Sequence, residues 1–347
     1  MQLNPLLEAS IREFKGHVEH IRMANASVNW SSDDEFVGPI SEGSSPFLKV
    51  YHWYFFAFNV VFMGPTIIGN SLILISLIRF RRLRLIRAYI LVGNLALSDL
   101  LVGLVAMPMD IAFLVTDKFT NSIPFCTAHM SSIYTFIGLS VVNLFLLSME
   151  RFDAIVSPFE HDRRFTKSRI YVCIAFTWIF MILFGFLPFV TMKNIDREHF
   201  QCRMKQVFPL VYRKLFLSIV LLSLVLSTVF FLYIVRVATR NIAGFNRTDS
   251  LLQHRRMKKD LRHTRSMLII TGLFIAFWGP FCVVSLVPDP SNTVLLVRNW
   301  LSSLGVINSC INWMVYGVRC KKFRAAFISI LKCSCVQKDY KLPATSF

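Results

Sequence analysis

AYILVGNLALSDLLVGLVAMPM, residues 88–109, carries a single charged side chain, Asp99, among residues that are mostly apolar. A helix rises 1.5 Å per residue, so about 20 residues cross the roughly 30 Å hydrocarbon core of a bilayer. Lipid cannot satisfy unpaired backbone amides, and a helix pairs all of its own. The stretch therefore predicts a transmembrane helix.

Six further windows of comparable length lack Lys, Arg, Asp and Glu altogether. They are Tyr51–Ile78, Thr127–Met149, Ile170–Met192, Leu215–Val235, Ser266–Val287 and Asn299–Val318. With Ala88–Met109 they predict an all-α membrane protein built as a seven-transmembrane helix bundle over residues 50–318. Residues 1–49 form a preceding tail and residues 319–347 a following segment. An odd number of spans places the two termini on opposite sides of the membrane.

The composition agrees with this fold class. The 347 residues are 54% hydrophobic and only 17% charged, whereas soluble domains run nearer 25% charged. The net charge of +18 could indicate a nucleic-acid partner. Its basic residues are, however, divided among loops between the spans rather than gathered on one face, so we expect no nucleic acid.

The loops predict the orientation. Basic residues are concentrated between the first and second spans, between the fifth and sixth, and after the seventh, which the positive-inside rule places in the cytoplasm. The tail before residue 48 holds seven acidic side chains against three basic ones. The N-terminus is therefore expected outside and the C-terminus inside a plasma membrane, and no signal peptide is recognised before Pro46. Two outer sequons, at Asn25 and Asn29, are candidate glycosylation sites.

Polar side chains at membrane depth are costly and call for a reason. They include Asp99, Asn70, Ser140, Asn308, Ser309 and Asn312. A carboxylate with hydroxyl and amide oxygens could hold a small hard cation such as sodium. The alternative, favoured by spacing alone, is a hydrogen-bonded polar core that fixes helix packing.

The third span ends in Glu150-Arg151-Phe152. This pair could simply reach to the membrane interface, as is common at helix ends. Alternatively Arg151 exchanges partners between helices, with Asp260 at the start of the sixth span as a candidate. In that span Pro280 removes one backbone hydrogen bond and is expected to bend the helix.

These features together resemble the rhodopsin-like, class A G-protein-coupled receptors over roughly residues 50–335. The motifs are Gly69-Asn70, Leu95-Ala-Leu-Ser-Asp99, Cys126, Ser148-Met-Glu-Arg151-Phe152, Trp178, Tyr233, Phe274-Ile-Ala-Phe-Trp278-Gly-Pro280, Asn312-Trp-Met-Val-Tyr316 and Phe323-Arg-Ala-Ala-Phe327. Each is weak alone, and their order and spacing make the set specific. The last motif resembles the amphipathic eighth helix of that family.

The resemblance implies roles for many of these residues. A sodium pocket would consist of Asp99, Ser140, Asn308, Ser309 and Asn312, with sodium as an allosteric ion. An activation switch would consist of Glu150, Arg151, Asp260, Tyr233, Phe274, Trp278, Pro280 and Tyr316. Cys126 would pair with Cys202 in an oxidising exterior. Cys333 and Cys335 would be palmitoylated. The implied partners are a heterotrimeric G protein, arrestin and membrane lipid.

Three departures from the family pattern stand out. Val225 occupies the place of the usual proline in the fifth span, so the usual bulge is in question. Trp313 replaces the proline that follows the seventh-span asparagine, which puts the local kink in question. Phe152 replaces a tyrosine. Loss of the fifth-span proline also occurs in the melanocortin, cannabinoid and lysolipid branches, a faint similarity.

The ligand is less well indicated. Ile133 stands where amine receptors carry an aspartate, and Val306 where visual pigments carry the retinal lysine, so neither ligand is expected. Candidate pocket residues are Asp110, His129, Tyr134, Lys214, Trp278, Phe281, Ser285 and Arg298. Lys214 and Arg298 are interpreted first as reaching to lipid headgroups, and alternatively as attracting an acidic ligand. We interpret His129 as packed or hydrogen-bonded rather than as a proton switch, and no metal cluster surrounds it.

The predicted function is that of a receptor that converts binding of an extracellular ligand into G-protein activation. The alternative is a transporter or channel, which the absence of repeat symmetry between the two halves disfavours. No nucleophile with a neighbouring base is recognised in the spans, so no enzymatic activity is expected.

Overall fold

The computed structural model describes residues 46–116, 122–191, 200, 202, 207–243, 251–287 and 292–332. Side chains are described in these ranges except at 46–48, 158, 191, 238–243, 251–267, 292–293 and 295–296. The predicted sites at Asn25, Asn29, Cys333 and Cys335 lie outside the described residues. Asp260 lies in a described helix, but its side chain does not belong to the described part.

The described residues are almost all helical and contain no strand. The long helices are α2 (Pro46–Arg79), α7 (Ile123–Val156), α9 (Lys167–Thr191), α11 (Leu210–Ala243), α12 (Leu251–Ser285) and α13 (Asn292–Arg319). A further long helical segment runs through α4 (Arg87–Leu101), the π-helix η1 (Val102–Ala106) and α5 (Met107–Val115). Short helices are α3 (Arg81–Arg84), α8 (Pro158–Arg164) and α14 (Lys321–Leu331).

Seven long helical segments therefore coincide with the seven predicted spans. Six of them are apolar and long enough to cross a membrane. The other, α13, has 28 residues but carries Asn299, Asn308 and Asn312 among its apolar residues, which lowers its hydropathy. Most helices extend beyond the uncharged windows, because Lys and Arg are good helix formers and the backbone ladder continues into the polar flanks. The sixth is an exception at its end: α12 stops at Ser285, before the predicted Val287.

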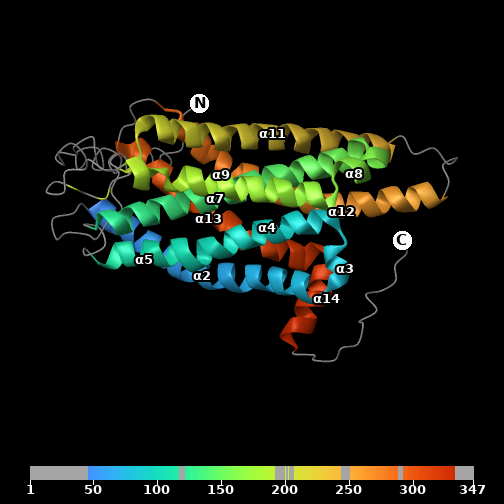
Figure 1. The fold of residues 1–347 in the computed structure, drawn as a ribbon, viewed down its shortest axis with the longest axis horizontal. Coiled ribbons are helices and arrows are strands. Elements are labelled where there is room, and N and C mark those ends of the chain that lie inside the picture. Colours follow the sequence, from blue (N-terminus) through green and yellow to red (C-terminus); the bar gives the residue numbers. More distant parts are fainter. Residues whose placement is uncertain are drawn as a thin grey trace, which may run out of the picture.

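The long helices run side by side, with α7 in the middle of the bundle (Figure 1). Helices α4, α9, α11 and α12 all pack against α7, while α2 packs against α4 and α13. The end of the bundle where α7 begins is called here the disulfide end. The opposite end, where α7 finishes after Arg151, is called the Arg151 end.

Large apolar side chains on α9 and α11 point away from the bundle. Phe176, Leu183, Leu222 and Val229 are each more than half exposed. Such surfaces would be unfavourable in water and match a hydrocarbon environment. The chain is therefore a multi-pass membrane protein.

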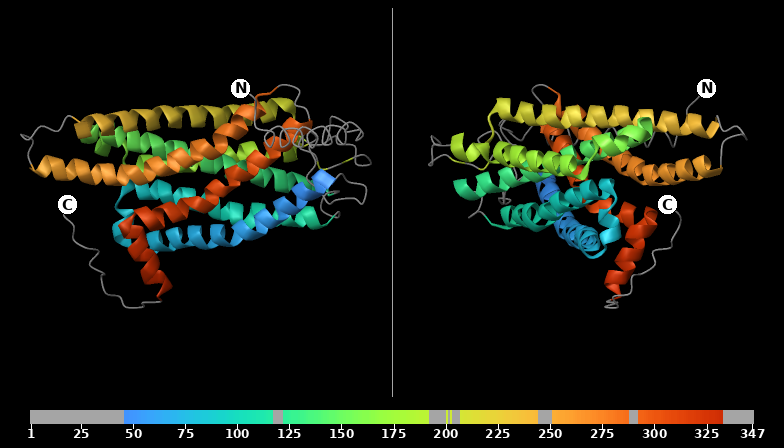
Figure 2. Two further views of the ribbon diagram at one scale, coloured as in Figure 1. Left: turned by 180° about the vertical axis from the view of Figure 1, so that it is seen from behind. Right: turned by 45° about the vertical axis from the view of Figure 1, so that its right-hand side comes forward.

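At the Arg151 end, α14 turns across the direction of the long helices (Figure 2). It buries Phe323, Ala326 and Phe327 and leaves Ile328 and Leu331 exposed. The Phe323 ring lies 5.0 Å from Tyr89 and 5.5 Å from Tyr316, measured between ring centroids. The short amphipathic helix expected from Phe323–Phe327 is thus present and is packed on the bundle.

One irregularity interrupts the second span. Residues Val102–Ala106 form a single π-helical turn that ends two residues before Pro108. Proline has no N–H for the carbonyl four residues earlier, and its ring crowds that carbonyl, so a wider turn relieves the conflict. Pro65, Pro188 and Pro280 lie inside α2, α9 and α12, which remain helical around them.

Candidate functional site

A buried polar network centres on Asp99 in α4. Its Oδ1 accepts a hydrogen bond from Ser140 Oγ of α7 at 3.0 Å, and its Oδ2 accepts one from Asn312 Nδ2 of α13 at 2.8 Å. The Ser309 side chain also hydrogen-bonds to Asp99. Asp99 is completely buried. One carboxylate thus connects three helices that are far apart in the sequence.

Asn70 of α2 extends this network. Its Nδ2 donates to the Ser309 carbonyl at 3.1 Å and to the Thr66 carbonyl at 2.9 Å. Its Oδ1 is buried without a hydrogen-bond partner in the structure. The structure therefore brings Asp99, Ser140, Ser309 and Asn312 together as the sodium-pocket prediction requires, and it places Asn308 buried nearby in the same helix.

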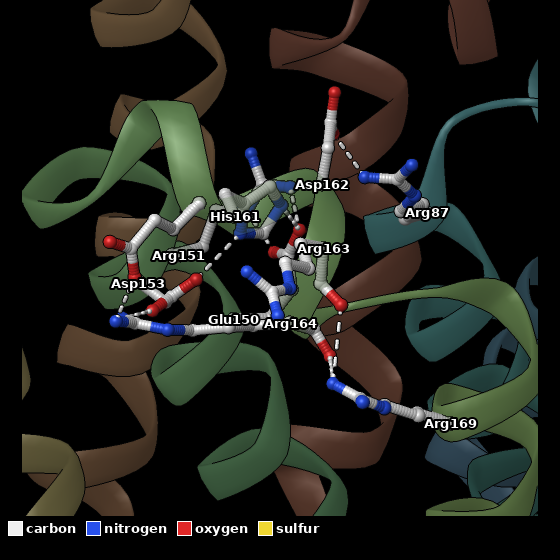
Figure 3. Close-up of polar contacts among 10 residues, drawn as sticks. Arg87, Glu150, Arg151, Asp153, His161, Asp162, Arg163, Arg164 and Arg169 are labelled. Carbon is white, nitrogen blue, oxygen red and sulfur yellow. Dashed lines mark hydrogen bonds and ion pairs between the residues drawn. The ribbon is translucent and has the colours of Figure 1, made fainter.

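The second centre lies at the Arg151 end (Figure 3). The Glu150 carboxylate accepts two hydrogen bonds from the neighbouring Arg151, one from Nε and one from Nη2, the latter at 2.7 Å. Glu150 is completely buried, and the Arg151 side chain is 15% exposed. This bidentate pair holds the guanidinium at the end of α7.

The aromatic residues around this pair come from two different places. Phe152 packs against Tyr233 of α11, with ring centroids 5.2 Å apart, and Tyr233 is 44% exposed. Tyr316 of α13 is buried against Phe323. The two tyrosines of the predicted switch thus lie in different surroundings, one on the outside of α11 and one in the core.

The other predicted switch residues lie in α12. Phe274 and Trp278 are buried, and Pro280 lies inside the helix. Trp278 covers Gly305 of α13, where an added Cβ would come within 2.7 Å of the indole. The Ser148 and Thr271 hydroxyls, 3.3 Å apart, join α7 to α12. Helix α12 is therefore held to its neighbours at two levels of the bundle.

At the disulfide end, Cys126 is bonded to Cys202 with a Cα–Cα distance of 5.7 Å, which confirms the predicted disulfide. Asp110 Oδ1 and His129 Nε2 are 2.7 Å apart, and both side chains are buried. Phe113 stacks on the His129 ring at 4.9 Å. His129 is therefore both packed and hydrogen-bonded.

The remaining pocket candidates are spread over four helices. Tyr134 packs among Phe208, Tyr212 and Phe216, with ring centroids 4.3 to 5.9 Å away. Trp278 meets Phe281 edge to face at 5.6 Å. Lys214 is exposed on α11, whereas Ser285 on α12 and Arg298 on α13 are partly buried.

Several partners were not recognised in the sequence. Trp178 Nε1 donates to Asn94 Oδ1 at 2.8 Å, and Asn94 in turn donates to Asn143, which ties α4, α7 and α9 together. Arg87 of α4 forms an ion pair with Asp162 of α8. Asn94 and Asn143 are amide side chains inside predicted spans, and this could have drawn attention to them in the sequence. The pairing of Arg87 with Asp162 joins charges from two different loops, and no local sequence pattern predicts it.

The departures from the family pattern also have structural outcomes. Helix α11 is a regular α-helix through Val225, with no widened turn. Helix α13 continues through Asn312 and Trp313. The Trp313 ring lies on Gly69 of α2, in space that a side chain would otherwise fill.

The polar network, the Glu150–Arg151 pair and the disulfide lie in a seven-helix arrangement, and residues 69–316 match the family described as 7 transmembrane receptor (rhodopsin family). The chain belongs to this family. It is a G-protein-coupled receptor, and nothing in its relationships supports the transporter or channel alternative.

Relatives of this receptor have several different ligands in their names. It is 26% identical over 306 residues to octopamine receptor beta-2R of Chilo suppressalis, covering 77% of each chain. It is 26% identical over 287 residues to sphingosine 1-phosphate receptor 1 of Danio rerio, covering 79% of this chain and 77% of the relative. It is 25% identical over 307 residues to 5-hydroxytryptamine receptor 4 of Cavia porcellus, covering 80% and 79%. The sequence identities to receptors with different ligands in their names are nearly equal, so they do not indicate a subfamily.

Proposed function

We propose that this receptor lies in the plasma membrane with the disulfide end outside and the Arg151 end in the cytoplasm. An extracellular ligand binds near the disulfide end and shifts the population toward a state in which Arg151 leaves Glu150 and meets a heterotrimeric G protein. The observation that carries this proposal is the buried Glu150–Arg151 pair. In this proposal the pair holds the group that meets the G protein, so we take the structure as a resting state.

A sodium ion at Asp99 belongs to the same proposal. Carboxylate and hydroxyl oxygens from Asp99, Ser140 and Ser309 suit a small hard cation, and the unpartnered Oδ1 of Asn70 offers a further oxygen close by. The ion would neutralise the buried carboxylate and hold α4, α7 and α13 in the resting arrangement.

The ligand is proposed not to be a monoamine recognised through the third span. Ile133, at the position of the amine-binding aspartate, packs with Phe62 and Met63 against buried Val102 and Met107. An ammonium placed there would be desolvated without a partner. Acidic ligands are the first to test, because Lys214 is exposed on α11 and Arg298 lies on α13.

Further partners and modifications complete the proposal. Arrestin and anionic lipid would use the basic cytoplasmic loops. Glycans at Asn25 and Asn29, and palmitoyl groups at Cys333 and Cys335, would follow from the proposed orientation. We propose no catalytic activity, since the family consists of receptors.

G-protein recruitment in cells expressing the full chain, without ligand, tests the proposal. Glu150→Gln weakens the hold on Arg151 and is expected to raise the basal signal of one G-protein subtype. Arg151→Ala is expected to abolish that signal at unchanged surface expression. Full coupling by Arg151→Ala, or no response of any subtype to Glu150→Gln, would contradict the proposed switch.

A further inference from the structure

His161 of α8 joins the Glu150–Arg151 pair, because its ring meets the same oxygen of Glu150, Oε1, that accepts from Arg151 Nη2. Its Nε2 lies 3.3 Å from Glu150 Oε1, and its Nδ1 lies 3.1 Å from Asp153 Oδ2 (Figure 3). The His161 side chain is 13% exposed. Both ring nitrogens therefore face a carboxylate oxygen.

With both carboxyl groups ionised, only one protonation state of the ring satisfies both contacts. A neutral imidazole has a single N–H and presents a lone pair at its other nitrogen, which would face the lone pairs of a carboxylate. The doubly protonated ring donates at both nitrogens. The geometry is accordingly that of an imidazolium bridging Glu150 and Asp153.

The charged groups around the ring come from four helices. On α7 they are Glu150, Arg151 and Asp153, and on α8 they are Glu160, Asp162, Arg163 and Arg164. Arg164 binds both Asp153 and Glu160, Arg87 of α4 binds Asp162, and Arg169 of α9 donates to the carbonyls of Arg163 and Arg164. Phe165 stacks on the ring with centroids 5.3 Å apart. The groups in direct polar contact with the ring are thus two acids.

These contacts change the proton affinity of the ring. The hydrogen bond to Glu150 raises the pKa of His161 above its ordinary value and the one to Asp153 adds to this, whereas burial and the charge of Arg151 oppose it. A histidine needs only a small shift to titrate near the pH of a cytoplasm. Departure of Arg151 would remove an opposing charge and so strengthen proton binding.

The coupling is reciprocal. If the proton binds more tightly once Arg151 has left Glu150, then a bound proton favours the departure of Arg151 by the same factor. The imidazolium also remains as the counter-charge of buried Glu150, which would otherwise be left unpaired at a large cost.

We propose that protonated His161 is a positioning residue of the Glu150–Arg151 switch: it keeps Glu150 in place when Arg151 leaves, so that acidification of the cytoplasm favours G-protein coupling. The inference rests on the proposed release of Arg151 and on the proposed orientation. It assigns to the loop helix α8 a role in setting basal activity.

The first test measures the proton itself. The full-length receptor, labelled with ¹⁵N-histidine in lipid nanodiscs, is titrated by NMR, and the His161 signal is assigned by its loss in His161→Gln. The midpoint should lie above that of an ordinary histidine side chain, and Arg151→Gln should raise the proton affinity further, by about five-fold, the low end of typical coupling between sites. An unchanged or lowered midpoint in Arg151→Gln would overturn the proposal.

The second test measures coupling. Basal nucleotide exchange on the G protein identified by recruitment should rise about five-fold from pH 8 to pH 6. His161→Lys, with a permanent charge, should be high at both pH values, and His161→Gln low at both. Lys167→Gln changes an exposed cation at the start of α9 that is not among the charged groups around the ring, and it should follow the wild type. Persistent pH dependence in His161→Gln would overturn the proposal. If no G protein responds even to Glu150→Gln, the proposed function fails, and the NMR titration still decides the role of His161.

Discussion

Trp313 of α13 lies directly on Gly69 of α2: a Cβ added to Gly69 would come within 2.1 Å of the indole carbons. The bulky residue at the place of the usual proline is thus accommodated by the absence of a side chain on the neighbouring helix. Here the glycine is required by a close approach between helices and not by its backbone angles.

Gly69→Ala is therefore expected to destabilise the receptor. Overpacking a filled space typically costs about 1–3 kcal/mol, and the melting temperature in detergent should fall accordingly. Trp313→Leu removes the obstructing ring, so the double variant Gly69→Ala, Trp313→Leu should lose less stability than the two single changes together. Strict additivity would show that the two residues do not compete for one space.

Sodium should stabilise the resting receptor through Asp99. A ligand that binds only the folded state adds stability as its concentration rises, so the wild-type melting temperature should increase when sodium chloride replaces choline chloride. Asp99→Asn removes the charge and should abolish the difference. Ser148→Ala, which alters another buried hydroxyl on α7, is the control and should keep it. An equal sodium effect in Asp99→Asn would rule out a site at this carboxylate.

The stability of the Arg151 end should depend on pH through His161. The pKa of His161 in the folded receptor is raised above the ordinary histidine value of 6.5. Its contribution to the free energy of unfolding is therefore complete below pH 6.5 and is lost as the pH rises through the higher pKa of the folded state. Thermal unfolding of the wild type between pH 6 and pH 9 should show this decline. His161→Gln should unfold with little change over the same window, and a decline as steep as in the wild type would point to another group.

The Asp110–His129 contact should be worth more than a surface contact, since both side chains are buried. His129→Ala leaves the Asp110 carboxylate without this partner and should cost about 2–3 kcal/mol. His129→Gln retains a donor and should lose less. In a double-mutant cycle, Asp110→Asn should reduce the cost of His129→Ala, and melting temperatures of the four proteins measure this. Independent effects would indicate that the two groups do not interact.

The sequence predicted the fold well because each span is a local pattern. An uncharged run such as Thr127–Met149 defines a helix by itself, and the pairing of Cys126 with Cys202 followed from the family resemblance. What the windows missed were the helix ends, because α7 continues past Met149 to Val156 through charged residues. Absence of charge marks the hydrocarbon region and not the limit of backbone hydrogen bonding.

The site was less accessible to sequence reasoning. Asp99 and Arg151 are charged residues at or near membrane depth, so the sequence alone identifies them as candidate functional residues. His161, by contrast, lies in a polar loop and resembles any solvated histidine. Only the return of the chain at Ser157 into α8 brings its ring back against Glu150 and Asp153. The role of such a residue depends on its position in the tertiary structure, which periodicity and composition do not predict.

The π-helical turn at Val102–Ala106 has a consequence for reading related chains. A π turn holds one residue more than the α turn it replaces, and one residue corresponds to about 100° around a helix. Asp110 faces His129 because the π turn absorbs that extra residue. In a relative without the bulge, the residue that faces the histidine lies one position closer to the aspartate that corresponds to Asp99. Counting forward from Asp99 without a gap would therefore pair each later residue of this segment with the wrong residue of that relative. An alignment of this receptor with such relatives needs a one-residue gap between Leu101 and Met107.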